Sequence, residues 1–528
     1  MSHPALGIDL GTTNSVVATL DQHGDVVVLP NAVGSELTPS VVYFEADGSV
    51  VVGEQALQAT AADPERGVRL IKRQMGTEFP LLISGQEHTP ESISALILRY
   101  LVAGASPGAD SAQRQRAVIT VPAYFGLAER EATYQAGLIA GIEVLQLLDE
   151  PVAAAAHYGL TTGGDRTVLV YDLGGGTFDT TVLRISGGAV TVVATDGHHH
   201  LGGADVDQRL LDVVGDRLEQ VLSASDFEQF MDDQQLLGGL VLDIEAAKRD
   251  LSARVSREVV VRTPTGRVRI AVSRADLEAA CADLVDTTTE IIDRVLASAR
   301  AAGARAVDDV IMVGGSSRVP LLAERLGALT GRAPRLVEPD LAVAKGAALR
   351  AHQLLGTPEL TALARSAGKL AAGPSLGVGR VTTVAPRAVG ILVEDSHDPA
   401  GQRSFVEHLV RGGTPLPVTV TEERFGTILS NQESVRIQVY EQAGPVASAQ
   451  VEHNRRVLDG ELTKIGALPA GSVIRITMTI AADGRLTVVA HEPVSGREIT
   501  LEAFVEGVVD QAETERLSRL VGMTVLRG

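Results

Sequence analysis

The stretch 168–179, VLVYDLGGGTFD, joins a short apolar run to a glycine-rich turn flanked by two aspartates. The stretch 6–14, LGIDLGTTN, has the same plan: an apolar run, an aspartate, then glycine and threonine. A short apolar run that ends at such a turn is typical of a buried strand. Glycine lets the backbone approach a ligand closely, and successive backbone N–H groups then form a nest for an anion. The repeat predicts two similar lobes that face one ligand.

The chain around these stretches alternates between strand-like and helical patterns up to about residue 350. Apolar runs rich in valine and isoleucine include AVITVP (117–122), TTVLRI (180–185) and DVIMVGG (309–315). Amphipathic stretches such as 90–102 and 128–140 have the period of helices. This alternation predicts an α/β fold.

A different pattern follows from about residue 385 to residue 503. Here alternating segments such as SVRIQVYE (434–441) and VIRITMTI (473–480) predict strands, and AADG (481–484) predicts a hairpin turn. We therefore expect a separate antiparallel β domain, followed by a short amphipathic helix over 505–520.

Composition and charge narrow the class of protein. The formal net charge is −20, which disfavours nucleic acid and anionic membrane surfaces as partners. No run of 18 or more uncharged apolar residues predicts a transmembrane helix, and the start lacks the pattern of a secretory signal. A single cysteine, Cys281, cannot form an internal disulfide, so we expect a reducing, cytoplasmic location.

The two glycine-rich turns have side chains suited to phosphate and magnesium. Hydroxyls of Thr12, Thr13 and Thr177 can donate hydrogen bonds to phosphate oxygens. Asp9 and Asp172 end their strands and can hold Mg²⁺ through water, because Mg²⁺ prefers oxygen ligands and keeps several waters. A third turn, GGSSR (314–318), could receive a flat base, although alone it is equally an ordinary strand-to-helix turn.

Eight motifs occur in the order found in the DnaK-type (seventy-kilodalton heat-shock) chaperones, and the chain resembles that family. They are GIDLGTTNS, ITVPAYF, DEPVAAAAHYGL, YDLGGGTFD, HLGGADVD, IEAAKRDLS, VGGSSRVP and EPDLAVAKGAAL. The resemblance implies an actin-like ATPase domain, with a duplicated ribonuclease-H-like fold, before an antiparallel β-sandwich and a short C-terminal helix. The expected boundaries are 1–355 for the ATPase domain, 356–384 for an interdomain helix and linker, 385–503 for the substrate-binding sandwich, and 504–528 for a vestigial lid helix.

The resemblance also implies roles for residues that pattern alone leaves ambiguous. Lys72 alone would be a surface charge on a helix, and Glu150 a loop residue. In the family their counterparts act on ATP, so the expected catalytic residues are Lys72, Glu150, Asp172 and Thr177, with Asp9 and Asp172 holding Mg²⁺ through water. The expected nucleotide-binding residues are Gly11, Thr12, Thr13, Asn14, Gly174, Gly175, Gly176, Gly202, Gly203, Glu245, Lys248, Arg249, Ser252, Gly314, Gly315, Ser316, Arg318 and Asp340.

Four of these residues have helical spacing. Glu245, Lys248, Arg249 and Ser252 fall at i, i+3, i+4 and i+7, so they share one helix face. Such a face is ordinarily a solvated surface. The resemblance implies instead that Glu245 and Lys248 contact the ribose, and that Arg249 and Ser252 contact the base.

The β domain has counterparts of peptide-binding residues. The resemblance places Ile391, Phe425, Val435 and Ile437 at pocket-lining positions, whereas the simpler interpretation is sandwich core. Glu394 lies where the family usually has an apolar residue over the peptide. A carboxylate there would favour a basic or polar segment.

Other departures concern partners. Gln146, Asp149 and Thr383 replace the Arg, Asn and Asp that the family uses for J-domain co-chaperones and for the linker. Losing charged partners should weaken that docking. With few residues after the sandwich, we also expect fast peptide release.

The sequence therefore predicts an ATP-dependent chaperone that binds client polypeptide and uses ATP, ADP and Mg²⁺. A J-domain co-chaperone and a nucleotide-exchange factor are possible partners with altered contacts. Three alternatives stay open: a nucleotide-dependent scaffold for one fixed partner, a small-molecule kinase of the actin-like superfamily, and an actin-like filament protein.

Overall fold

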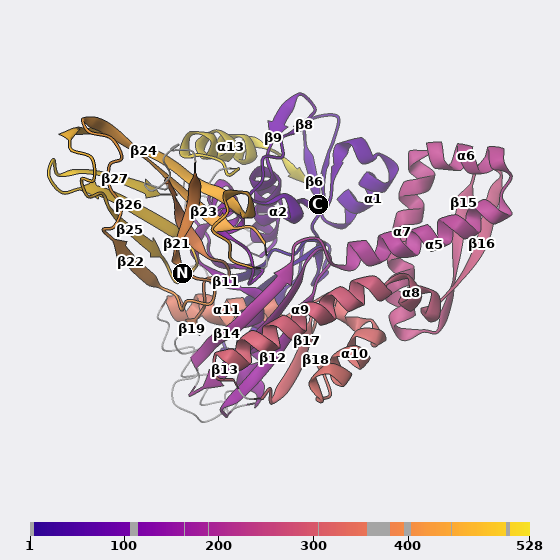
Figure 1. The fold of residues 1–528 in the computed structure, drawn as a ribbon. Coiled ribbons are helices and arrows are strands. Elements are labelled where there is room, and N and C mark those ends of the chain that lie inside the picture. Colours follow the sequence, from indigo (N-terminus) through magenta and orange to yellow (C-terminus); the bar gives the residue numbers. More distant parts are fainter. Residues whose placement is uncertain are drawn as a thin grey trace.

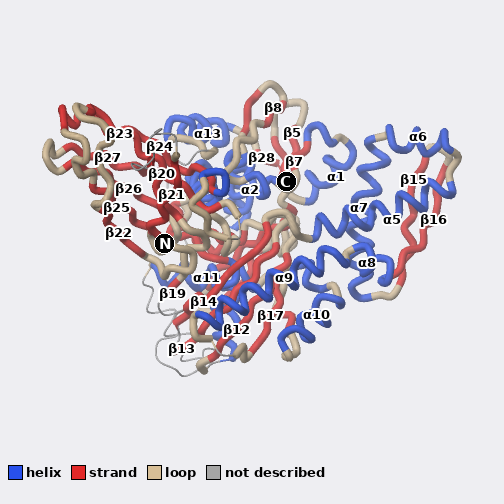
Figure 2. The backbone as a smooth tube through the Cα atoms, in the orientation of Figure 1, coloured by secondary structure: helices blue, strands red, loops and turns tan. Residues whose placement is uncertain are grey.

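The computed structural model describes residues 5–105, 114–162, 164–187, 189–304, 306–355, 381–394, 403–444, 446–502 and 507–527. Figures 1 and 2 show a large α/β part, with a β sandwich beside it and helix α13 (Gln511–Met523) above the region where they meet. The expected interdomain helix and most of the linker lie outside the described residues.

The first half of the α/β part, lobe I, is built on a mixed sheet of order β11-β10-β1-β2-β3. β1 pairs antiparallel with β2 and parallel with β10, and β4 adds to β2. Its strands are β1 (Leu6–Asp9), β2 (Asn14–Leu20), β3 (Val26–Leu29), β4 (Thr38–Pro39), β10 (Arg116–Val121) and β11 (Glu143–Asp149). Its helices include α2 (Pro90–Ala105) and α3 (Leu127–Ile139).

The second half, lobe II, repeats this plan with the order β18-β17-β12-β13-β14-β19. β12 pairs antiparallel with β13 and parallel with β17, as β1 does with β2 and β10. Its strands are β12 (Arg166–Leu173), β13 (Phe178–Ser186), β14 (Ala189–His198), β17 (Asp309–Val313), β18 (Arg335–Leu336) and β19 (Val381–Thr382). The predicted duplication is thus confirmed at the level of strand order and direction.

Helices α4 (Glu150–Thr162) and α11 (Ala342–Leu354) lie between the two sheets. Their small buried residues, such as Ala153 and Ala347, join both lobes in one core because alanine lets the helices approach closely. Helices α9 (Ala282–Ala301) and α10 (Pro320–Thr330) cover lobe II. Cys281 lies buried between α8 (Arg274–Ala280) and α9, as a core residue should.

Smaller layers extend each lobe away from the sheets. On lobe I, a four-stranded sheet has the order β28-β6-β5-β7, with α1 (Glu54–Ala62) beside it. Its strands are β5 (Val42–Phe44), β6 (Val50–Val52), β7 (Gly67–Val68) and β28 (Leu526–Arg527), followed along the chain from β7 by η2 (Ile71–Gln74) and the hairpin β8 (Leu81–Ile83) and β9 (Gln86–His88). Lobe II adds α5 (Gly203–Val221), α6 (Ala224–Asp232), α7 (Gln234–Ala253) and the hairpin β15 (Ser256–Thr263) and β16 (Gly266–Ser273).

The β domain is a sandwich of two four-stranded antiparallel sheets, β21-β20-β23-β24 and β22-β25-β26-β27. The strands are β20 (Val389–Glu394), β21 (Ser404–Val410), β22 (Val418–Glu422), β23 (Gln432–Gln442), β24 (Asn454–Leu468), β25 (Arg475–Ile480), β26 (Leu486–Glu492) and β27 (Arg497–Glu502). The alternating pattern of the sequence matches the alternating burial along β25 and β26, as one-sided burial requires.

The C-terminal prediction needs a correction. The helix starts at Gln511 rather than at residue 505, because Asp510 caps it by accepting a hydrogen bond from the Glu513 amide. It is followed by a short strand, β28, that the sequence did not indicate.

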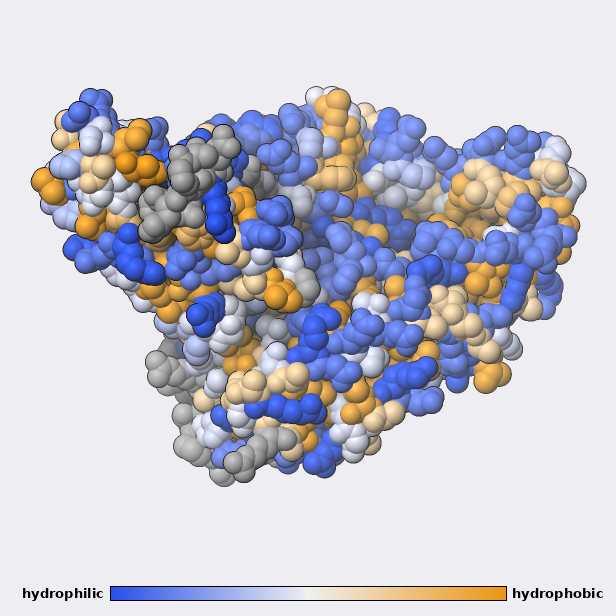
Figure 3. All heavy atoms as spheres, viewed as in Figure 1, coloured by the Kyte–Doolittle hydropathy of each residue, from blue (hydrophilic) through white to orange (hydrophobic). Residues whose placement is uncertain are grey.

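None of the helices in the described ranges has the length and apolar character that a membrane span needs. Figure 3 shows hydrophilic and apolar residues interspersed over one face of the molecule.

Candidate functional site

A cavity of about 950 Å³ lies between the lobes, with walls from both mixed sheets and from α7. It is lined by these predicted residues: Asp9, Gly11, Thr12, Thr13, Asn14, Lys72, Glu150, Asp172, Gly174, Gly175, Thr177, Glu245, Lys248, Arg249, Ser252, Gly314, Gly315, Ser316, Arg318 and Asp340. The fold thus brings residues from seven separate segments to one place.

The two repeated glycine turns touch each other at the floor of this cavity. A Cβ on Gly175 would lie 1.7 Å from Thr13 Oγ1, and one on Gly176 would lie 2.3 Å from Thr12 Cγ2. Only glycine fits where two loops approach so closely. The turns therefore form one continuous cradle with backbone amides and threonine hydroxyls, suited to an anion.

Gly202 and Gly203 support this cradle instead of lining it. The Gly203 amide donates to Gly174 O at 2.9 Å, and a Cβ on Gly202 would lie 2.6 Å from Gly176 N. A Cβ on Gly314 would lie 2.4 Å from Leu173 O. The third turn therefore packs directly on the second, and this close contact explains why position 314 needs a glycine.

If the cradle binds the phosphates of a nucleotide, as the sequence predicts, replacing Gly175 with alanine should reduce nucleotide affinity at least ~10-fold, because the new methyl group would push the two turns apart. Titration with a fluorescent ATP analogue measures the change. The matched control is Gly215→Ala on α5, where a Cβ meets no heavy atom within 4 Å. Equal affinities for the two variants would contradict the cradle.

A buried ion pair lies at the floor of the cavity. Lys72 Nζ lies 2.6 Å from Glu150 Oε1, and the two side chains are only 5% and 9% exposed. Burial alone would lower the pKa of Lys72, but Glu150 and Asp9 raise it above the usual value. The lysine is therefore a fixed cation.

Three buried aspartates surround this pair. Burial raises the pKa of Asp9 to about 7, with a further contribution from Glu150, and raises the pKa values of Asp172 and Asp179 well above the usual range. The sequence analysis did not name Asp179. It ends the quoted glycine stretch and lies directly opposite Asp172 in the β12–β13 ladder. The available signal was an aspartate directly after the glycine turn, at the start of a strand-like run.

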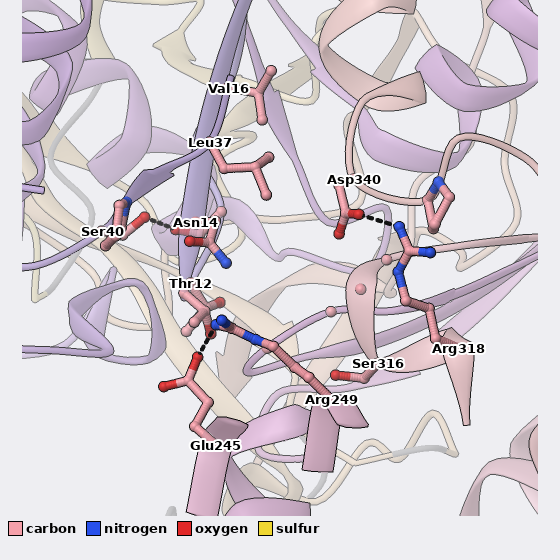
Figure 4. Close-up of a pocket in the computed structure, with 18 of the residues that line it drawn as sticks. Thr12, Asn14, Val16, Leu37, Ser40, Glu245, Arg249, Ser316, Arg318 and Asp340 are labelled. Carbon is pink, nitrogen blue, oxygen red and sulfur yellow. Dashed lines mark hydrogen bonds and ion pairs between the residues drawn. The ribbon is translucent and has the colours of Figure 1, made fainter. Parts of the chain in front are cut away.

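The predicted helix face of α7 forms one wall of the cavity. Figure 4 shows Arg249 reaching Glu245, and Arg318 reaching Asp340 on the opposite side. Lys248 also lines the cavity, but its ammonium group is bound by protein oxygens, with Nζ 2.7 Å from Asp207 Oδ2 and 2.9 Å from Gly203 O. Arg69, which the sequence analysis missed, comes from lobe I and places Nη2 3.4 Å from Glu245 Oε2.

The predicted peptide-site residues separate into two groups. Ile391 and Ile437 are 5% and 2% exposed and belong to the sandwich core, whereas Phe425 and Val435 are half-buried at its edge. Glu394 is exposed at the end of β20. Next to Phe425, Ile428 and Leu429 are exposed apolar residues that the sequence analysis did not single out.

The sandwich is docked on lobe I through α3. Arg130 forms a buried ion pair with Asp149 at 2.7 Å and also donates to Asp483 O of the sandwich at 3.3 Å. The Leu127 amide donates to the buried Glu441 at 3.1 Å. Leu127 and Ala128 also belong to the sandwich's core cluster.

The linker joins lobe II as well. Despite having few apolar side chains, its residues Val381 and Thr382 pair in parallel with Val190 and Thr191 of β14, so they extend the sheet as strand β19. The next residue, Thr383, donates from Oγ1 to Ala482 O of the sandwich at 3.1 Å.

The fold and the cavity define a two-lobed nucleotide-binding protein with an attached β sandwich. A family model described as "Hsp70 protein" matches residues 5–83 and 80–365. The chaperone protein DnaK of Thermotoga neapolitana is 37% identical over 524 residues, covering 97% of this chain and 82% of that protein. DnaK of Thermosipho africanus is 35% identical over 504 residues, covering 93% and 78%. The chain belongs to the Hsp70 family.

Proposed function

We propose that this chain is an ATP-dependent chaperone that hydrolyses ATP to ADP between its lobes and thereby controls the binding of client polypeptide to its sandwich. The observation that carries the proposal is the buried Lys72–Glu150 pair among three buried aspartates, in the cavity that the paired glycine turns also line. The likeness to DnaK chaperones over nearly the whole chain supports the chaperone role.

The floor of the cavity fits a divalent cation. Four buried carboxylates, Asp9, Glu150, Asp172 and Asp179, face the single ammonium group of Lys72, so negative charge is in excess. Within the described parts of the chain, no three His, Cys, Asp or Glu side chains are placed to bind one ion directly. Asp9 and Asp172 would hold Mg²⁺ through water, and the ion would neutralise phosphate charge.

The protein's own groups would position and stabilise the reacting phosphate. Amides and hydroxyls of the two glycine turns would bind phosphate oxygens, with Thr12, Thr13 and Thr177 as donors. Lys72 would offset the charge that develops on the γ-phosphate, and Glu150 would orient the attacking water. This division of labour suits phosphoryl transfer, in which positioning and electrostatics supply most of the catalysis.

Binding of Mg·ATP should release protons near neutral pH. Burial raises the pKa of Asp9 to about 7, so part of the metal-free protein has this carboxyl protonated, whereas Mg²⁺ requires the carboxylate. Affinity should therefore rise between about pH 6 and pH 8. Calorimetric titrations in buffers of different ionisation enthalpy count the released protons, with Asp9→Asn as the control. Release in Asp9→Asn should be smaller but not absent, because the pKa of Asp172 is raised as well. Equal release with and without the substitution would assign it to groups other than Asp9.

Nucleotide control of the sandwich has a direct test. If the docked arrangement belongs to one nucleotide state, a fluorescent extended peptide should leave the protein at different rates with Mg·ATP and Mg·ADP. The ratio of the two dissociation rate constants should exceed ~5, which at equal association rates corresponds to a coupling free energy near 1 kcal/mol. Identical rates in the two nucleotides would contradict the chaperone proposal while leaving the ATPase proposal intact.

A scaffold for one fixed partner is the second candidate, and two replaced residues favour it. Gln146 accepts a hydrogen bond from Arg350 at 2.8 Å, and Asp149 is bound inside by Arg130. Neither side chain is a cation, and both already accept hydrogen bonds from arginines of this chain. These positions therefore cannot take the place of the arginine that the family uses to bind a J-domain. Binding of one protein with no response to model peptides would identify this alternative.

For the chaperone itself, we also propose a cytoplasmic location, a dedicated client and the use of a nucleotide-exchange factor.

A further inference from the structure

Lobe II closes one side of the cavity with the turn 314–318 and with Asp340, which lies just before α11. Figure 4 shows Arg318 reaching the Asp340 carboxylate, to which it donates a hydrogen bond. A Cβ on Gly315 would lie 2.9 Å from Asp340 Oδ1, and the first amide of the turn donates to Pro339 O at 2.7 Å. The position of this wall therefore depends on how the chain enters α11.

The same side of the cavity has an apolar lining, made by Val319, Leu336, Pro339 and Val343. Phosphate needs amides, hydroxyls and cations, whereas a flat base also buries apolar surface and can stack on a guanidinium such as that of Arg318. Within the proposed function, the phosphates belong at the glycine turns and the base belongs at this wall.

The chain enters α11 through a residue with a strained backbone. Glu338 has a left-handed conformation with φ of 35°, which is unfavourable for a residue with a side chain and persists only where its surroundings fix it. Its carbonyl oxygen accepts hydrogen bonds from the amides of Leu341 at 2.8 Å and Ala342 at 2.9 Å, at the start of α11. The bend thus satisfies two amides that the start of a helix leaves without intrahelical partners. It also fixes Pro339 and Asp340, which lie between the bend and the helix.

The side chain of Glu338 is held by two helices. Lys345 of α11 donates a hydrogen bond to Glu338 Oε2, and His157 Nε2 of α4 lies 3.5 Å from the same oxygen. The side chains of Lys345 and His157 are only 17% and 14% exposed. Although burial opposes ionisation, the hydrogen bond from Lys345 and the nearby His157 lower the pKa of Glu338, so the carboxylate is charged. Burial lowers the pKa of His157, so at neutral pH Lys345 supplies the positive charge.

Helices α4 and α11 form a close-packed pair that can anchor this carboxylate. A Cβ on Gly346 of α11 would lie 1.9 Å from Ala153 O of α4, so the two backbones are in direct contact. Helix α4 begins at Glu150, which lines the floor of the cavity. The wall that suits the base is thus tied, through Glu338, to the element that places Glu150.

We propose that Glu338 is a positioning residue for the nucleotide base: Lys345 and His157 hold its carboxylate, this clamp maintains the strained turn, and the turn sets Asp340 and Arg318 against the base. The inference deepens the proposed function, on which it rests for the identity of the ligand. All three clamp residues lie in motifs that the sequence analysis quoted, but that analysis named none of them as a site residue.

Two substitutions of one residue separate the clamp from the strain that it opposes. Glu338→Ala and Glu338→Gly both remove the carboxylate, but only glycine adopts a left-handed backbone without cost. Glu338→Ala should therefore weaken binding of ADP at least ~5-fold, whereas Glu338→Gly should bind ADP within ~2-fold of the unmodified chain. Lys345→Met, which leaves the turn itself unchanged, should also weaken ADP binding and tests the clamp if Glu338→Ala fails to fold. The matched control is Glu324→Ala, at an exposed glutamate of α10.

Calorimetric titration of the full chain with ADP and Mg²⁺ measures these affinities, and displacement of ADP by pyrophosphate measures the phosphate site alone. Affinity for pyrophosphate should be the same in all variants, because the clamp acts on the base and not on the glycine turns. Equal ADP affinity in Glu338→Ala and the control would overturn the proposal, as would equal losses in Glu338→Ala and Glu338→Gly or a matching loss of pyrophosphate. Failure of the unmodified chain to bind ADP would instead contradict the proposed function.

Discussion

Lys72→Ala should lower the single-turnover rate of ATP hydrolysis at least ~100-fold while leaving nucleotide bound, since removing one preorganised electrostatic group from an active site typically costs ~10²–10³. The substitution deletes the ammonium group that lies at the floor of the cavity near Glu150, Asp9, Asp172 and Asp179. Phosphate binding should survive, because the glycine turns and threonines supply most donors.

The control for this substitution is Lys464→Ala on β24, an exposed lysine of the sandwich. Rapid-quench measurement of ADP formation, with ATP below the enzyme concentration, separates chemistry from product release. Hydrolysis by Lys72→Ala at the rate of the control would show that the buried pair is structural and that the catalytic cation lies elsewhere.

Asp149→Ala should destabilise lobe I by about 3–5 kcal/mol, because it leaves the guanidinium of Arg130 buried without its carboxylate. Both side chains are 5% exposed, and their nitrogen and oxygen lie 2.7 Å apart. Arg130 also contacts Asp483 O, so the loss should extend to docking of the sandwich. Asp149→Asn keeps an acceptor for the hydrogen bond and should cost less.

The matched control is Asp283→Ala, which breaks the Arg209–Asp283 pair, whose side chains are 46% and 60% exposed. An exposed pair is worth only about 0–1 kcal/mol. Urea unfolding followed by circular dichroism compares the variants. A loss for Asp149→Ala no larger than that for Asp283→Ala would mean that Arg130 finds other partners and that the buried pair is not a structural link.

The sequence predicted those parts of the fold and the site that depend on local patterns, such as strand ends, glycine turns and helical spacing. Asp9 and Asp172 each follow an apolar strand and precede glycine, so their positions at paired turns followed from the repeat. The spacing of Glu245, Lys248 and Arg249 placed them on one face of α7. The sequence could not show that Lys248 turns toward Asp207, because α5 brings that carboxylate from a distant segment.

Tertiary contacts explain what the sequence analysis missed. Arg69 follows a two-residue strand and reaches Glu245 across the cavity, and nothing in its neighbours predicts that contact. Ile391 and Ile437 have the same apolar character whether they line a pocket or fill a core, and only the packing of two sheets distinguishes these outcomes. The pairing of Leu526 with Val50 joins distant ends of the chain through backbone groups, which have no sequence signature.

The measurement that tests the central claim most directly is Mg²⁺-dependent ATP turnover by the full chain, alone and with a panel of extended apolar and basic peptides. The account predicts turnover that changes severalfold with at least one peptide class and that vanishes in Lys72→Ala. Turnover that is equal with every peptide would contradict coupling between cavity and sandwich, and turnover without Mg²⁺ dependence would contradict the site itself.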